Sequence, residues 1–246
     1  MKAQNTFQRA CAWSGLVTLA MFFGAFLLSD FVPLLSPDAS AQEIARHYQE
    51  HTTGIRLGSC IMLLSGAFYA VYTAVISAQM RRIPGVQPAA VYAQLSAGSF
   101  GCLTFLVPAM FFAVTAFRPD RDPADTLMLN DLSWVLLIMP VTPFMAQNFS
   151  FAFAVLSDRG AVPLFPRWLG YVNIWAPLML IPEITIPFFK TGPLAWDGLL
   201  AIYVPSAVVI TQFILNTRQL LRAIGSDDGG AGYDGKRIAK ALVADA

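Results

Sequence analysis

Apolar residues along the chain gather into long runs that are separated by short polar or proline-containing segments. A helix needs about 20 apolar residues, within a range of roughly 17–25, to cross the hydrocarbon core of a bilayer. Each of the long runs meets this requirement. The sequence therefore predicts six transmembrane helices, over Cys11–Val32, Gly54–Gln79, Ala89–Phe117, Leu132–Leu156, Trp168–Pro187 and Gly198–Leu221.

This pattern predicts an all-α fold, a polytopic membrane helix bundle formed by residues 1–222. Within the bundle, residues 36–53 form an outer loop with an amphipathic helix, because Ser40 and Glu43 have the spacing of a capping box. Residues 223–246 are rich in glycine, which is typical of a flexible segment. We expect a cytoplasmic tail there that ends in a short helix.

Composition agrees with a membrane location. Of the 246 residues, 56% are hydrophobic and only 13% are charged, whereas soluble domains carry about 25% charged residues. The net charge of +1 provides no electrostatic basis for binding nucleic acid. With two histidines and three cysteines, the chain lacks the ligands for a histidine-rich di-iron centre, a bis-histidine haem or a disulfide framework. We expect no cofactor.

The distribution of positive charge predicts the orientation of the bundle. If the N-terminus is cytoplasmic, eleven of the 16 Lys and Arg residues fall on the cytoplasmic side and five on the outer side. Short cytoplasmic segments of membrane proteins carry the excess of Lys and Arg. Both termini are therefore predicted to be cytoplasmic, in a multi-pass protein of the bacterial inner (cytoplasmic) membrane.

Several short segments at or between the ends of the predicted helices are distinctive: Thr53–Gly58, Arg118–Pro123, Asn130–Leu132, Phe165–Trp168 and Lys190–Pro193. With these segments the chain resembles, over its whole length, six-span bacterial integral membrane proteins to which no function is assigned. The resemblance implies the six-span topology. It implies no role for any residue.

The segment His47–His51 matches the H-x-x-E-H pattern of inverted zinc proteases. On a helix His47 and His51 share a face, and Glu43 lies four residues before His47 on the same stripe, so these three side chains are the candidate metal ligands. Metal sites also need a supporting shell of residues. A short surface helix lacks such a shell, so we expect a solvated polar face and no bound metal.

Ionisable residues inside a membrane are costly, at about 2.5–3.5 kcal/mol each near its middle. Those near the outer ends of the predicted helices are Arg56, Arg118, Asp131, Glu183 and Asp197. They are predicted to form a charge-paired network at the outer mouth of the bundle. The network is either structural, with Asp131 and Asp197 acting as helix N-caps, or a functional site in which Glu183 is the deepest acid.

Prolines interrupt the fourth predicted helix near its middle, at Pro140 and Pro143. Each proline removes a backbone hydrogen bond, and such breaks persist in lipid only where protein or cavity water satisfies the freed carbonyl. Transporters build binding sites at broken helices, but prolines also produce ordinary kinks. A ligand cavity beside this break is therefore one of two interpretations.

The sequence is compatible with three functional hypotheses. The first is a non-catalytic protein, either an accessory subunit of a membrane complex or a binder of a hydrophobic small molecule or lipid. The second is an intramembrane enzyme for an isoprenoid- or sterol-like substrate, with Glu183 and Asp131 as catalytic acid and base. The third is a small transporter. The candidate ligand-binding residues are Arg56, Trp134, Asn148, Asn173, Trp175 and Asp197.

Overall fold

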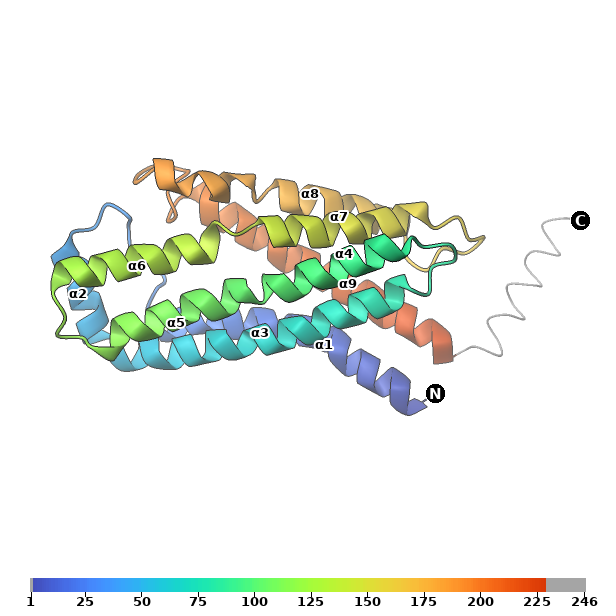
Figure 1. The fold of residues 1–246 in the computed structure, drawn as a ribbon, viewed down its shortest axis with the longest axis horizontal. Coiled ribbons are helices and arrows are strands. Elements are labelled where there is room, and N and C mark those ends of the chain that lie inside the picture. The colour runs from blue at the N-terminus through green and yellow to red at the C-terminus, as the bar shows by residue number, and fades with distance from the viewer. Residues whose placement is uncertain (1, 229–246) are drawn as a thin grey trace, which may run out of the picture.

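The structure, a computed structural model, describes residues 2–228 as a bundle of long helices (Figure 1). No strand occurs among these residues. The short element η1 is a 3₁₀ helix and η2 is a π-helix. The elements in chain order are α1 (Lys2–Leu28), α2 (Ala41–Glu50), α3 (Thr52–Met80), α4 (Pro88–Gly101), α5 (Leu103–Phe117), α6 (Pro123–Ile138), α7 (Thr142–Ser157), α8 (Arg167–Leu178), η1 (Ile181–Phe188), η2 (Leu199–Tyr203) and α9 (Val204–Asp228).

These elements form six stretches that are long and apolar enough to cross a membrane, which confirms the predicted all-α, six-span bundle. The first two spans are the continuous helices α1 and α3. Each of the other four is made of two helical pieces: α4 with α5, α6 with α7, α8 with η1, and η2 with α9. The spans are Asn5–Leu28, Thr52–Met80, Pro88–Phe117, Pro123–Ser157, Arg167–Phe188 and Leu199–Ser226.

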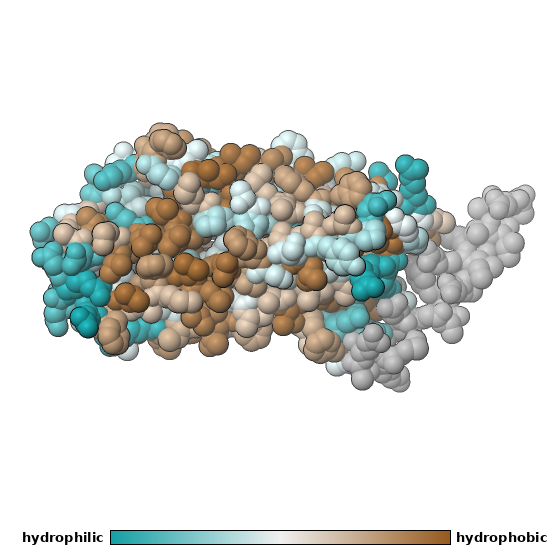
Figure 2. All heavy atoms as spheres, viewed as in Figure 1, coloured by the Kyte–Doolittle hydropathy of each residue, from teal (hydrophilic) through white to brown (hydrophobic). Residues whose placement is uncertain are grey.

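The face of the bundle that Figure 2 shows carries a broad apolar band between two polar ends. Large apolar side chains are exposed on several helices, among them Phe100, Phe153 and Trp175. Soluble monomers rarely expose contiguous apolar patches of such extent, whereas lipid chains solvate them without cost. The chain is therefore a multi-pass membrane protein.

Both ends of the described chain lie at the same end of the bundle, because α1 begins and α9 ends there (Figure 1). The opposite end carries α2, the start of α3 and the start of α6. We call these the termini end and the α2 end. The prediction that the termini end is cytoplasmic stays a prediction.

The fourth span begins earlier than the sequence predicts. The helix α6 begins at Pro123, not at Leu132. Asp122 is its N-cap and accepts a 2.8 Å hydrogen bond from the backbone N–H of Ala124, and Pro123 occupies the first helical position, where it needs no hydrogen bond. Polar residues in the first turns of α6 lower the local hydropathy, which is why hydropathy places the boundary too late. Asp131 therefore lies inside a helix, and its predicted role as an N-cap is wrong.

The C-terminal boundary of the bundle also differs from the prediction. The helix α9 continues through Asp228, six residues beyond the predicted end of the bundle at 222. The rest of the predicted glycine-rich tail and its short terminal helix lie outside the described residues.

The predicted amphipathic segment at the α2 end contains the expected capped helix. The backbone N–H of Ser40 donates to the Glu43 carboxylate at 2.8 Å, and the N–H of Glu43 donates to the Ser40 hydroxyl at 3.3 Å, which completes the capping box of α2. Ile44 and Tyr48 on the apolar face of α2 are fully buried. The amphipathic helix is thus packed onto the end of the bundle, where it contacts α3, α5 and α6.

The buried apolar side chains divide into two clusters. The termini-side cluster includes Phe213, on whose ring the rings of Tyr69 and Tyr72 both stack. The α2-side cluster is centred on Trp134, which is fully buried and packs against the rings of Phe26, Phe31, Phe112 and Trp196. The interior between these two clusters is not completely filled.

Candidate functional site

A cavity of about 160 Å³ lies between the two core clusters. Phe26 and Ile138 of the α2-side cluster line one part of it, and Tyr69 and Phe213 of the termini-side cluster line another. All six spans contribute to the walls, so the cavity belongs to the bundle as a whole. Most of the lining is apolar, with three phenylalanines from α1, Phe22, Phe23 and Phe26.

Among the residues that the structure describes, Glu183 is the only carboxylic acid in this lining. It lies in the first turn of η1, and only 9% of its surface is exposed. Among the described residues, no hydrogen-bond donor or cation pairs with its carboxyl group. Polar groups inside proteins are normally paired, because an unpaired one loses its bonds to water without replacement. The Glu183 carboxyl is therefore available to a molecule that enters the cavity.

The proline break of the fourth span also reaches the cavity. Pro140 and Val141 lie between α6 and α7 and line the wall, and Pro205 near the start of α9 lines it as well. The backbone N–H of Val141 donates to the carbonyl of Met139 at 2.8 Å, which closes a tight turn in place of a helical bond. The broken helix and the cavity thus coincide, as one of the two interpretations of the prolines predicts.

Most of the predicted site residues do not line the cavity. Asp131, the predicted partner of Glu183, lies on α6 outside the lining, so the two carboxyl groups do not face one cavity. The six predicted ligand-binding residues are also absent from the lining. Their surroundings are of three kinds.

The predicted charge network at the outer mouth does not form within residues 2–228. Arg56 donates instead to the backbone carbonyls of Ala116 and Phe117 at the end of α5, both at 3.1 Å. These carbonyls have no helical partner at the end of α5, so a guanidinium satisfies them well. Asp197 lies in the turn before η2 and makes no side-chain cap, so its predicted role as an N-cap is wrong.

The predicted ligand-binding residues Trp134 and Trp175, and Trp196, which stacks on Trp134, have other surroundings. Trp134 is enclosed in the α2-side cluster, and its indole N–H donates to Asn130 at 3.1 Å. Trp196 is likewise buried and donates to the carbonyl of Leu35 at 2.8 Å. Trp175 is 61% exposed on the apolar band and faces outward. None of the three presents a free ring to the cavity.

Asn148 and Asn173 come together in a buried amide cluster, in which Oε1 of Gln212 has no hydrogen-bond partner among the described residues. Gln212 on α9 donates to Asn148 at 2.5 Å and to Asn173 at 2.8 Å. Asn173 donates to Asn216 at 2.9 Å and accepts from it at 3.0 Å. These side chains pair with one another and join α7, α8 and α9, so they act as connections between helices.

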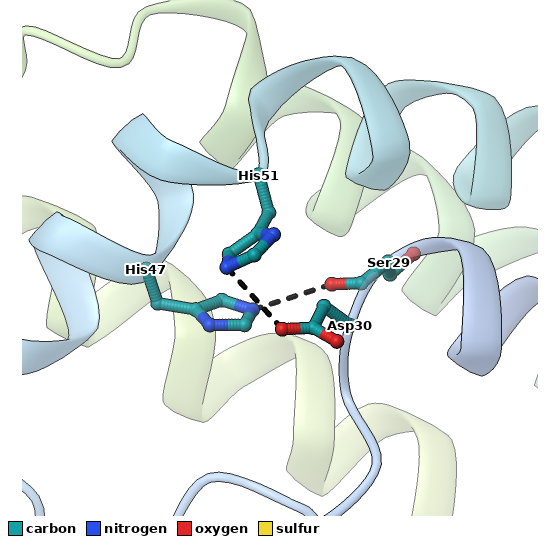
Figure 3. Close-up of polar contacts among 4 residues, drawn as sticks. All are labelled: Ser29, Asp30, His47 and His51. Carbon is teal, nitrogen blue, oxygen red and sulfur yellow. Dashed lines mark hydrogen bonds and ion pairs between the residues drawn. The ribbon is translucent and has the colours of Figure 1, made fainter.

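A second polar group lies at the α2 end (Figure 3). Nε2 of His51 is 3.3 Å from Oδ2 of Asp30, and Nε2 of His47 is 3.3 Å from the carbonyl oxygen of Ser29. Burial, and next the neighbouring His51, lower the pKa of His47. Glu43, the predicted third ligand, is bound instead by Ser40 in the capping box, and the hydrogen bonds from Ser40 lower the pKa of Glu43. The third potential ligand beside the two histidines is Asp30.

Sequence reasoning missed Asp30 and most of the cavity wall. Asp30 follows α1 and is separated from His47 by a loop. The two come together because the segment after α1 lies against α2, where the ring of Phe31 packs on His47 and Tyr48. The spacing of Phe22 and Phe26, four residues apart on one helix face, is a signal for a shared contact surface. It does not distinguish a cavity wall from a lipid-facing stripe.

The chain has no recognisable relative in the comparisons with known proteins. No family model, no curated protein and no solved structure matches it. The resemblance to six-span bacterial membrane proteins therefore stays a prediction. The function is therefore inferred from the geometry of the cavity and of the second polar group at the α2 end.

Proposed function

We propose that the protein is a non-catalytic membrane protein that binds a lipophilic molecule in the cavity between its two core clusters. The observation that supports this is the pairing of an apolar wall with one unpartnered acid, Glu183. Binding sites for small molecules are mostly apolar, with a few polar groups that fix orientation. The expected ligand has a hydrocarbon body and one group that hydrogen-bonds to a carboxyl.

The size of the cavity limits this ligand. A buried apolar cavity of about 150 Å³ in another protein is large enough for a benzene ring. A cavity of about 160 Å³ therefore holds one ring or a short stretch of an acyl or isoprenoid chain. A longer lipid would place the rest of its chain between the helices or in the bilayer.

The proposal is tested by native mass spectrometry of the protein in mild detergent, after incubation with an extract of its membrane lipids. We expect a retained mass on the parent protein. Ser206→Phe, which fills the cavity from α9, removes this mass, whereas Ala207→Phe, on the exposed side of the same helix, retains it. Equal retention by both variants would contradict the proposal.

Glu183→Gln and Glu183→Leu separate the role of the polar group from that of the wall. Glutamine keeps a hydrogen-bonding group of the same length and leucine removes it. If the acid orients the ligand, we expect leucine to lower the retained fraction about fivefold to tenfold, the loss that corresponds to one hydrogen bond of about 1–1.5 kcal/mol. Identical retention in the leucine variant would show that Glu183 does not contact the ligand.

A transporter is the second candidate, because the interrupted spans surround the cavity. Pro140 and Pro205 both line it, at the break between α6 and α7 and near the junction of η2 and α9. Discontinuous helices around a central site are the usual design of secondary transporters. Pro140→Ala in protein reconstituted in liposomes should slow movement of a retained ligand between leaflets, and unchanged movement would count against a hinge at this position.

We place the protein in the bacterial cytoplasmic membrane with both termini inside, on the strength of the Lys and Arg distribution. Its partners in this proposal are the lipid bilayer and the lipophilic ligand. The exposed apolar band also suits contact with other membrane subunits, as the accessory-subunit form of the hypothesis requires.

A further inference from the structure

The second polar group gathers every histidine of the sequence at one point. The chain has two histidines, and both lie beside Asp30 at the α2 end (Figure 3). One potential ligand atom from each of Asp30, His47 and His51 lies within 4.8 Å of the other two. Asp30 follows α1, His47 is in the last turn of α2, and His51 is the residue between α2 and α3.

We propose that Asp30, His47 and His51 form a Zn²⁺ site that joins the end of α1 to α2. Two imidazoles, one carboxylate and a water molecule are an established ligand set for tetrahedral zinc, with bonds of about 2.0–2.2 Å. The site is independent of the lipophilic cavity between the core clusters. No sulfur ligand takes part in it.

One of the distances between ligand atoms already suits this geometry. Ligand atoms about 2.0–2.1 Å from a tetrahedral ion lie about 3.3–3.4 Å from each other. Nε2 of His51 and Oδ2 of Asp30 are 3.3 Å apart, which is this spacing. The remaining ligand atoms lie within 4.8 Å, so a small movement of the His47 side chain completes the site.

The surroundings hold the ligands in place, as a metal site requires. The ring of His47 stacks on Phe31, with ring centres 5.2 Å apart and an angle of 20° between the planes. The carbonyl of Ser29 lies 3.3 Å from His47 Nε2 and orients the ring. Asp30 has φ of 53°, the left-handed region that non-glycine residues rarely occupy and that concentrates at functional sites.

An ion can reach the site from water. The side chains of His51 and Asp30 are 36% and 61% exposed. A polar pocket that also contains Asp38, Glu43 and Glu50 opens beside His47. These carboxylates outnumber the single arginine of the pocket, Arg46, and so favour the approach of a cation.

The test uses the full chain in detergent, stripped of metal with a chelator and titrated with ZnCl₂ against a chromophoric competitor. We expect one zinc ion per chain. His47→Ala, His51→Ala and Asp30→Asn each weaken binding at least tenfold, because even outer-shell partners of a metal contribute about 10- to 100-fold. Asparagine tolerates the left-handed conformation, so Asp30→Asn keeps the fold.

Two controls distinguish this site from other zinc ligands. Asp120→Asn removes an exposed acid that lies outside the pocket, and Cys60→Ser removes the exposed thiol; both variants should bind zinc as the parent protein does. Cobalt in place of zinc should give the visible bands of a tetrahedral site with no sulfur-to-metal absorption. The melting temperature should rise with zinc in the parent protein and in these two controls, and not in the three ligand variants.

Three outcomes would overturn the proposal. The first is binding of less than a tenth of a zinc ion per chain. The second is equal zinc affinity in the parent protein and in the folded Asp30→Asn variant, and the third is loss of zinc binding in Cys60→Ser. In the first two, Asp30 and the histidines are an ion pair that holds the loop, and in the third the zinc is bound by a thiol.

Discussion

Asn173 has both ends of its amide group satisfied inside the bundle. Its partners Gln212 and Asn216 lie one helical turn apart on α9, and its other donor bond reaches the carbonyl of Leu169 at 2.8 Å. Hydrogen bonds between membrane helices average only about 0.6 kcal/mol, because a separated helix finds other partners. Replacing Asn173, which bonds to several neighbours, should lower the stability more than this, because several buried groups then lose a hydrogen-bond partner at once.

We expect Asn173→Leu to lower the free energy of unfolding by about 1–3 kcal/mol, the cost of leaving buried amides unpaired. The control is Thr211→Val on the exposed face of α9, where the hydroxyl bonds only to a carbonyl of its own helix. Denaturant titration in mixed micelles measures both. Equal stability of the two variants would show that the amide cluster contributes nothing.

Gly98 allows α4 to approach α3 closely. A Cβ built on Gly98 collides with the hydroxyl of Thr73 and lies 2.8 Å from its Cβ. That hydroxyl accepts hydrogen bonds from Gln94 and Gln147, each at 3.0 Å, so it cannot move freely. The small residues of this helix therefore serve contact within the chain.

Gly98→Ala should destabilise the protein by about 1–3 kcal/mol, as overpacking of a filled interior does. Gly24→Ala is the matched control, because a Cβ at Gly24 meets no atom within 4 Å. The control should be neutral or slightly stabilising, since alanine favours a helix more than glycine. Thermal unfolding in detergent compares them, and a stable Gly98→Ala variant would mean that α3 and α4 can separate at little cost.

Among the elements, the helix interruptions differ in how far the sequence reveals them. Pro140 and Pro143 predict the break between α6 and α7, because proline cannot continue the hydrogen-bond ladder. The π-helix η2 has the same signal in Pro205, because a proline cannot bond to the carbonyl four residues before it, here that of Ala201 within η2. The junction of α4 and α5 at Cys102 has no proline at the break. Such irregularities depend on packing against neighbouring helices, which the local sequence does not encode.

The element α2 should lose protection in acid. Hydrogen bonds from the backbone and hydroxyl of Ser40 lower the pKa of Glu43 in the folded protein. A lowered pKa means that the stabilisation is present above the unfolded pKa of about 4.3 and is lost as the pH falls through the folded value. Hydrogen exchange of α2, corrected for intrinsic rates, should therefore rise several-fold on going from about pH 6 to about pH 3.

Ser40→Ala provides the comparison for this pH dependence. Without its hydroxyl, the capping box is incomplete and α2 should exchange faster already at neutral pH. Its additional loss of protection in acid should be smaller than that of the parent protein. The same acid response in both proteins would assign it to another group at the α2 end.

For the whole molecule, the six-span bundle follows from hydropathy because lipid imposes a strict condition. Every backbone polar group in the hydrocarbon core must be satisfied internally, so a long apolar run has to be a helix. The cavity has no such signature, because its wall is made of ordinary apolar residues from all six spans. Only Pro140 and Glu183 indicate it in the sequence. In the sequence, Asn148 and Asn173 look like polar groups that contact a ligand. Their partner Gln212 on α9 lies far along the chain, so the sequence does not show that the two amides are already paired.

The predicted orientation is tested by cysteine labelling in intact cells. Asp38→Cys lies at the α2 end and Arg159→Cys in the loop at the termini end, and both positions are exposed. If the termini are cytoplasmic, an impermeant maleimide labels Asp38→Cys before lysis and Arg159→Cys only after it. The opposite order would reverse the orientation, since the two positions lie at opposite ends of the bundle.

The interrupted spans determine how the molecule resists an applied force. A continuous helix transmits tension through an unbroken series of hydrogen bonds, whereas an interruption has fewer of them. A chain pulled out of the membrane from the end of α9 should therefore rupture within a span, first at η2 and later at the break beside Pro140. The rupture positions would lie within the membrane around the cavity, so its walls are also the mechanically weakest part of the protein.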